Sequence, residues 1–190
     1  MAPVAVPHAL FEQKWPEGQF CYFQMGFVVD DIGAAAHDWA RVFGVGPFFV
    51  NPPVDARWRF QGHDAEVTMQ IATSWAGPVQ IELVKQHCER PSIFGPPLWA
   101  GSTGFHQVCT VTPDFDAKKR HYQSLGYEAV AEITGPLRVA YYDTYRDFGF
   151  FTEVVEDTPG FLEQRAALAA ICAQWDGSDP VRQISATGTS

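Results

Sequence analysis

The chain has 190 residues, with 13 Lys and Arg against 22 Asp and Glu and a formal net charge of −9. This acidic balance argues against nucleic acid and anionic membrane surfaces as partners, because both call for clustered basic side chains. Hydrophobic residues at 46% and charged residues at 18% indicate a folded globular protein. The first residues lack the basic stretch of a signal peptide and no apolar run approaches the roughly 20 residues of a spanning helix, so we expect a cytoplasmic protein.

The first half of the chain predicts one strand, one helix and then about three strands. Residues 20–29 are a β-rich run, and a helix is expected over 32–43, with Asp31 as its N-cap and Gly44 as its stop. The following strands are predicted at residues 47–50, 58–60, 66–73 and 79–85.

The second half repeats this order of elements. It predicts a strand over 105–111, a helix over 115–125 and strands over 127–133, 137–143 and 150–156. The predicted organisation is an N-terminal arm (1–18), a β-α-β-β-β module (19–86), a linker (87–103), a second such module (104–157) and a C-terminal helix and tail (158–190).

Four polar residues stand inside otherwise apolar strands. Gln24 and His106 occupy matching places in the first strand of each half, and Glu82 and Glu153 occupy matching places in the last. A buried carboxylate is costly unless it is paired or bound to a metal. Two carboxylates, an imidazole and an amide oxygen suit a divalent ion such as Zn, Ni, Co, Mn or Fe(II). Gln107, beside His106, is expected to point to the other face of its strand.

Several segments resemble the vicinal oxygen chelate superfamily, which includes glyoxalases, methylmalonyl-CoA epimerases and extradiol dioxygenases. They are GFVVDDIGAAAHDWARVFGVGPF, VQIELVKQH, GFHQVCTVTPDFDAKKRHYQSLGY and FFTEVVED, and together they cover most of residues 19–157. The resemblance implies an α+β fold in which two β-α-β-β-β modules form an open, cup-shaped eight-stranded sheet. It also implies a divalent metal on the cup floor, held by Gln24, Glu82, His106 and Glu153, a set most similar to that of glyoxalase.

A metal with two free positions would polarise a substrate carbonyl and make the neighbouring C–H acidic. The resemblance gives Glu153 the role of base, with Glu82 on the opposite face, and so implies a metal-dependent lyase or isomerase of the glyoxalase or epimerase type. Two alternatives stay open: an Fe(II) extradiol-type dioxygenase, and a metal-free small-molecule binding protein of the same fold.

The expected partner is a small-molecule substrate. Tyr142, Arg138 and His63 are candidates for contacting it. The insert 51–63 and the Pro-rich linker place aromatic and apolar residues near the expected cup mouth, which favours a hydrophobic or aromatic substrate. Family members often form dimers, and the C-terminal helix is a candidate homodimer interface.

Overall fold

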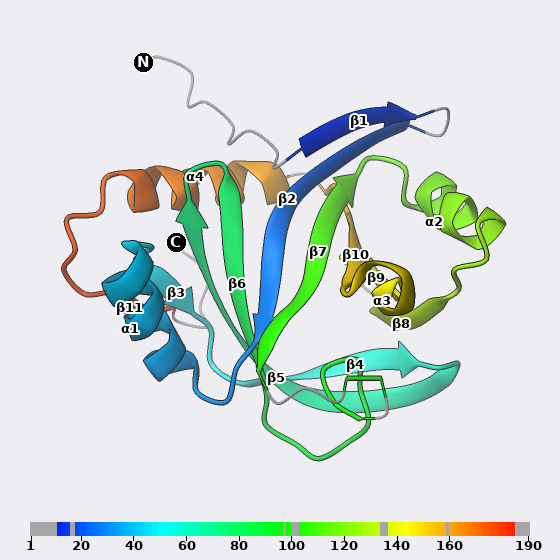
Figure 1. The fold of residues 1–190 in the computed structure, drawn as a ribbon, viewed down its shortest axis with the longest axis horizontal. Helices are drawn as coiled ribbons and strands as arrows, with labels where there is room; N and C mark the ends of the chain where they lie inside the picture. Colours follow the sequence, from blue (N-terminus) through cyan, green and yellow to red (C-terminus); the bar gives the residue numbers. More distant parts are fainter. Residues whose placement is uncertain are drawn as a thin grey trace.

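A computed structural model of the chain (Figure 1) describes residues 11–15, 18–96, 98–99, 103–133, 137–158 and 160–184. Its strands are β1 (Phe11–Trp15), β2 (Gly18–Val28), β3 (Phe48–Val50), β4 (Val54–Phe60), β5 (His63–Ala76), β6 (Val79–Gln86), β7 (Gly104–Thr112), β8 (Ala129–Ile133), β9 (Val139–Tyr142), β10 (Phe151–Glu156) and β11 (Val181–Gln183). Its helices are α1 (Ile32–Phe43), α2 (Phe115–Ser124), α3 (Tyr145–Phe148) and α4 (Phe161–Ala173). Short α3 lies between the predicted strands 137–143 and 150–156. Within the described ranges, no helix is both long enough and apolar enough to cross a membrane.

Local signals define the two long helices of the modules. The Asp31 carboxylate accepts a hydrogen bond from the Ala34 amide at 2.8 Å, and Gly44 ends α1 with a φ of 65°. In α2, Asp114 caps the helix in the same way, accepting from the Ala117 amide at 2.9 Å. The two helices lie on outer faces of the sheet, at opposite sides of the molecule in Figure 1.

The sheet runs through both modules and closes on itself. In each module the first strand pairs in parallel with the last, β2 with β6 and β7 with β10, and β2 pairs antiparallel with β7 to join the modules. Around the ring the order is β2-β7-β10-β9-β8-β4-β5-β6 and back to β2. The predicted α+β class and eight-stranded sheet are therefore confirmed.

The predicted open edge of the cup is not confirmed. The long β4–β5 hairpin of the first module reaches β8 of the second, where Arg59 pairs with Glu132 and Phe60 with Ala131. These two residue pairs complete the ring, so the site lies inside a barrel-like sheet rather than in an open trough.

The C-terminal segment packs on its own chain. Helix α4 lies against β5, and β11 then pairs in parallel with β3, outside the ring. Between them, the Trp175 ring packs on Gly46 so closely that a Cβ there would lie 2.6 Å from it. The segment is thus fastened to the barrel on both sides of Trp175.

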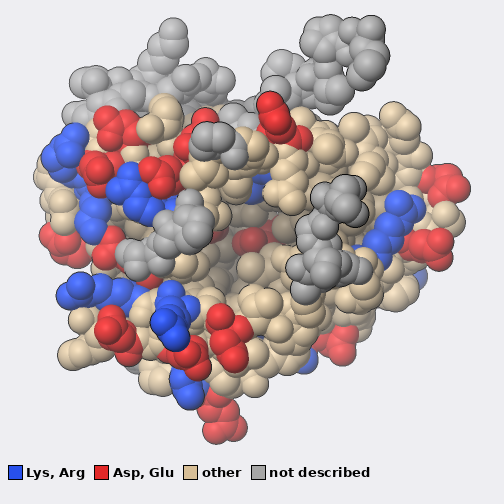
Figure 2. Space-filling view, turned by 180° about the vertical axis from the view of Figure 1, so that it is seen from behind, with Lys and Arg blue, Asp and Glu red and all other residues tan. Residues whose placement is uncertain are grey.

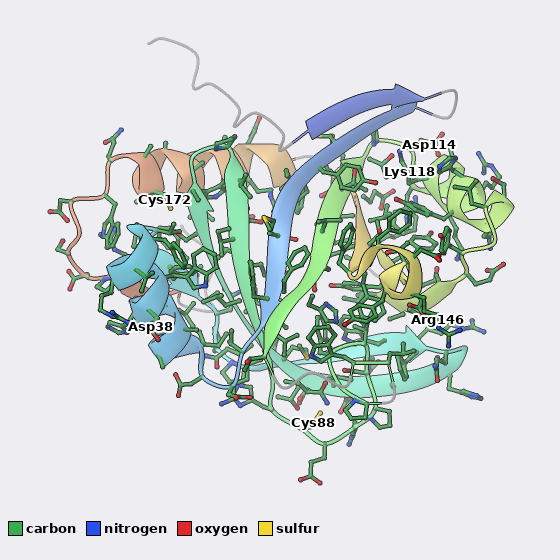
Figure 3. All side chains as sticks on the ribbon, viewed as in Figure 1. Asp38, Cys88, Asp114, Lys118, Arg146 and Cys172 are labelled. Carbon is green, nitrogen blue, oxygen red and sulfur yellow. The ribbon has the colours of Figure 1, made fainter. Side chains whose placement is uncertain are left out.

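The four cysteines are free thiols. Cys172 on α4 and Cys88 in the loop after β6 lie well apart in Figure 3, so they are not placed to form a disulfide.

Candidate active site

A cavity of about 220 Å³ lies inside the ring of strands. Figure 2 shows a hollow on the side opposite to that of Figure 1, with acidic atoms at its base. Apolar side chains form most of the wall: Val54, Ala56, Trp58, Met69, Ile71, Val84, Phe94, Ile133, Leu137, Val139, Val155 and Phe161. The polar lining residues are Gln24, Glu82, Tyr141, Glu153 and Arg165. The predicted insert and linker therefore do contribute to the cavity, through Val54, Trp58 and Phe94.

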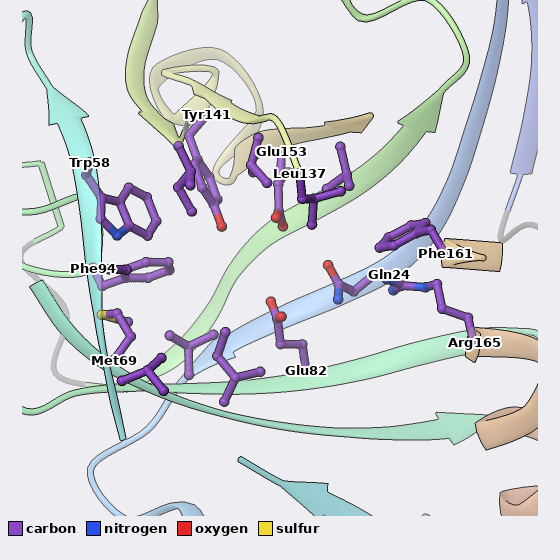
Figure 4. Close-up of a pocket in the computed structure, with 17 residues that line it drawn as sticks. Gln24, Trp58, Met69, Glu82, Phe94, Leu137, Tyr141, Glu153, Phe161 and Arg165 are labelled. Carbon is purple, nitrogen blue, oxygen red and sulfur yellow. The ribbon is translucent and has the colours of Figure 1, made fainter. Parts of the chain in front are cut away.

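Two buried carboxyl groups point toward one another across this cavity (Figure 4). Strand alternation turns Ile81 and Leu83 toward α1 and leaves Glu82 facing the cavity, with 8% of its surface exposed. Glu153 on β10 is 6% exposed. Burial raises the pKa of both groups, and the charge of Glu153 raises the pKa of Glu82 further. A hydrogen bond from the Tyr141 hydroxyl opposes this rise in the pKa of Glu153.

Gln107 connects the two carboxyl groups. Its side-chain amide lies 2.9 Å from Glu82 Oε2 and 3.3 Å from Glu153 Oε2, with Nε2 as the donor. The expectation that Gln107 faces away from the site is wrong, and a β-bulge is the reason. Gly26 pairs with Gln107 and Phe27 with Phe105, which leaves His106 as an extra residue on β7 and shifts the alternation of side chains.

His106 is fully buried beside the cavity but does not line it. Its Nε2 lies 2.9 Å from the Ile93 carbonyl oxygen, and its Nδ1 makes a short hydrogen bond to Gln107. Burial lowers the pKa of His106 to about 4, so the ring is neutral at physiological pH. The structure thus brings together three of the four predicted ligands, with Gln107 rather than His106 beside them.

Gln24 presents an unpaired oxygen to the cavity. Its Nε2 donates to Gln80 Oε1 at 2.7 Å, which fixes the orientation of the amide. Its Oε1 is buried without a hydrogen-bond partner among the described residues. A buried polar atom of this kind is costly unless a ligand, ion or water satisfies it.

The three predicted substrate contacts lie elsewhere. Tyr142 is fully buried and stacks on Tyr122 at 4.3 Å, because strand alternation turns its neighbour Tyr141 into the cavity instead. Arg138 pairs with Asp116 and Glu156 outside the barrel. His63 is exposed at the tip of the β4–β5 hairpin.

Helix α4 supplies two lining residues that the sequence reasoning missed, Phe161 and Arg165. The Arg165 guanidinium stacks on Phe23 and Phe161, with its central carbon 4.0 and 4.6 Å from the ring centroids, and donates to Gln80. The spacing of Phe161, Arg165 and Leu168 places them on one helix face, a signal that could have identified Arg165.

The polar groups that face the cavity suit a hard divalent cation, which prefers oxygen ligands, better than a cation that prefers nitrogen ligands. Across the described ranges no cluster of three or more His, Cys, Asp and Glu has the arrangement of a metal site. The cavity instead offers carboxylate oxygens from Glu82 and Glu153 and the unpaired amide oxygen of Gln24. Oxygen sets of this kind are typical of Mg²⁺ and Mn²⁺ sites.

With this geometry established, the comparisons with known proteins define the class. A family model described as the Glyoxalase/Bleomycin resistance protein/Dioxygenase superfamily matches residues 23–141, more than half of the chain. The chain belongs to this superfamily. No curated protein matches it in sequence.

Two solved structures show the same fold. A hypothetical protein, BH1468 from Bacillus halodurans C-125, superposes with a TM-score of 0.53 at 15% identity, over 73% of this chain and 95% of its own. Methylmalonyl-CoA epimerase from Mycobacterium tuberculosis superposes with a TM-score of 0.50 at 19% identity, over 75% of this chain and 91% of its own.

Proposed function

We propose that the protein is a divalent-metal-dependent isomerase or lyase that moves a proton next to a carbonyl group of a small, largely apolar substrate. One observation carries the proposal: Gln24, Glu82 and Glu153, from three different strands, converge on one buried cavity with apolar walls. The superfamily and the epimerase among the structural neighbours support this class of chemistry.

The hydrogen-bond donors and acceptors around Gln107 support a cation at the base of the cavity. The Ile93 carbonyl can only accept, so His106 Nε2 carries the proton, and a neutral ring then leaves Nδ1 as an acceptor. Exchanging Nε2 and Oε1 of Gln107 leaves its shape unchanged, lets its NH₂ donate to Nδ1 and turns Oε1 toward the two carboxyl groups. Oxygens this close need a cation, or protons on the carboxyl groups, between them.

The distances between Gln107 and the two carboxyl groups also fit a shared cation. Neighbouring ligands of an octahedral ion with oxygens at about 2.1 Å lie about 3 Å apart, and the Gln107 amide lies 2.9 and 3.3 Å from the carboxylate oxygens. Gln24, Glu82, Glu153 and Gln107 would hold the ion. When bound, it would supply positive charge that stabilises the enolate formed by proton removal.

The chain's own groups would handle the proton. Glu153 is the proposed base, held by the Tyr141 hydroxyl, and Glu82 faces it from the other side of the cavity. A substrate carbon between them could lose a proton to one carboxylate and regain it on the same or the opposite face. The apolar walls exclude water, which keeps the proton within the site.

Cavity size and lining limit the substrate. At about 220 Å³ the cavity is smaller than the roughly 300–1,000 Å³ of sites for drug-sized ligands. Trp58 and Phe94 contact each other edge to face, with centroids 5.8 Å apart, and form an aromatic wall. A short branched or flat apolar body fits this space.

An Fe(II) dioxygenase site is less well supported. Such sites use two histidines and one carboxylate, whereas no histidine is among the described residues that line the cavity.

Two measurements test the proposal. Mn²⁺ titration by calorimetry should show one site, and NMR in D₂O should show metal-dependent deuterium exchange next to the carbonyl of small acyl and oxo compounds. Glu153→Gln should abolish exchange, while Glu163→Gln on the exposed face of α4 should leave both readouts unchanged. Wild-type protein that takes up no divalent ion, or exchange that survives Glu153→Gln, would contradict it.

A further inference from the structure

The C-terminal helix places a cation at the proposed site. Arg165 is the one Lys, Arg or His among the described residues lining the cavity. It comes from α4, beyond residues 23–141 that match the family model. In Figure 4 its side chain extends from α4 toward Gln24, on the same side of the cavity as Phe161.

No close ion pair holds the guanidinium, although the charges of Glu82 and Glu153 act on it at longer range. Its faces pack on the rings of Phe23 and Phe161, and its terminal nitrogen donates to Gln80, the residue that also orients Gln24. No carboxylate lies within ion-pair distance of it in the described part of the chain. Its Nε is buried and has no hydrogen-bond partner there.

A buried guanidinium with a free donor is costly unless a ligand satisfies it. Carboxylates are the planar acceptors that match its fork of N–H groups. In the metal-loaded site of the proposed function, two ionised carboxylates balance a divalent ion, and the charge of Arg165 is left over. A single negative charge on the substrate would neutralise it.

We infer that Arg165 binds an anionic group, most simply a carboxylate, on the substrate, and that the substrate class is small apolar carboxylic acids carrying a second carbonyl. This inference rests on the proposed function for the reaction, but the anion contact itself does not depend on the metal. Arg165 is thus a specificity-determining residue, supplied by the segment that follows the two modules.

A comparison of the affinities for an acid and its neutral amide tests the role of Arg165. α-Ketoisocaproate and its neutral amide would be titrated into the protein by calorimetry, with and without Mn²⁺. Wild type should bind the acid about tenfold or more tightly than the amide, the size of one charge-assisted hydrogen bond. Arg165→Met should lose this preference while still binding Mn²⁺, since the variant removes none of the proposed ligands.

The matched control is Arg57→Met, which removes an equal charge from the exposed side of β4. The Arg57→Met variant should keep the preference for the acid over the amide. Thermal unfolding would check that each variant is folded, and Arg165→Lys, which keeps the charge without the planar fork, should retain part of the preference if Arg165→Met does not fold.

Equal binding of acid and amide by wild type, or no binding of either, would overturn the inference, as would an acid preference that survives Arg165→Met. If wild type binds no Mn²⁺ yet still prefers the acid through Arg165, the metal-dependent function fails and the anion site stands.

Discussion

Gly26 on β2 lies directly under the side chain of Gln107 on β7. A Cβ built at Gly26 would fall 2.5 Å from Gln107 Cδ, well inside van der Waals contact. The two residues are register partners at the point where the β-bulge adds His106 to β7. The absence of a side chain at Gly26 therefore leaves room for the Gln107 side chain that reaches Glu82 and Glu153.

We predict that Gly26→Ala displaces Gln107 and weakens Mn²⁺ binding by about tenfold or more. The crowding should also cost about 1–3 kcal/mol of unfolding free energy, as overpacking of buried sites does. Gly33→Ala is the control, because Gly33 lies in α1, where alanine favours the helix and its Cβ would come no closer than 3.4 Å to Asp31 Oδ1. Calorimetry and urea unfolding measure both effects. Unchanged Mn²⁺ affinity in Gly26→Ala would show that Gln107 has no part in the site.

Variants at Gln107 and His106 separate the ligand that we propose from the one expected from the sequence. Gln107→Ala should weaken Mn²⁺ binding at least as much as Gly26→Ala does. His106→Asn should destabilise the fold, since it alters the hydrogen bond to Ile93 and the packing on Phe94, but should retain measurable Mn²⁺ binding. The reverse order of metal affinities would return the ligand role to His106.

Neutralising one buried carboxyl group should stabilise the metal-free protein. Glu82 and Glu153 share one buried cavity, and burial and mutual repulsion raise the pKa of Glu82. In the presence of EDTA at pH 7, Glu82→Gln should increase the unfolding free energy by about 1–2 kcal/mol, because wild type must either bury a charge beside Glu153 or take up a proton on Glu82 when it folds. With saturating Mn²⁺ the order should invert, because wild type alone keeps its full set of ligands. A variant less stable than wild type in EDTA would argue that the carboxylates are already satisfied without metal.

The attachment of α4 should depend on Trp175. Its ring fills the space over Gly46, and the indole Nε1 donates to the Ser178 carbonyl oxygen at 2.5 Å. Trp175→Ala should speed amide hydrogen exchange in α4 and β11 while leaving β7 and β10 protected, and it should reduce the preference for a carboxylate ligand. Phe148→Ala, which removes an exposed aromatic ring on α3, should change neither. Equal amide exchange rates in α4 and β11 of Trp175→Ala and wild type would mean that other contacts hold these two elements.

The elements with local signals could be predicted from the sequence, and those that depend on distant pairing could not. Asp31 and Gly44 define α1 at both ends because capping depends on neighbouring residues alone. The side of the strand that Gln107 occupies follows from a bulge against β2, a contact between strands about 80 positions apart. Polar residues in apolar strands still identified Gln24, Glu82 and Glu153, which line the cavity.

Closure of the sheet and the placement of Arg165 likewise depend on contacts between segments far apart in the sequence, so they could not be predicted. The β4–β8 pairing spans two residue pairs between the modules, too short to leave a pattern in either strand. Arg165 lies on a helix that packs against β5, a strand about 90 positions earlier in the chain.

The most direct test of the central claim is a crystal structure of the protein with Mn²⁺, measured at a wavelength where manganese scatters anomalously. We expect one strong peak in the cavity, about 2.2 Å from oxygens of Gln24, Glu82 and Glu153, with the Gln107 amide oxygen turned toward it. A cavity without an anomalous peak under saturating Mn²⁺, or a peak coordinated by His106 with Gln107 turned away, would contradict the account.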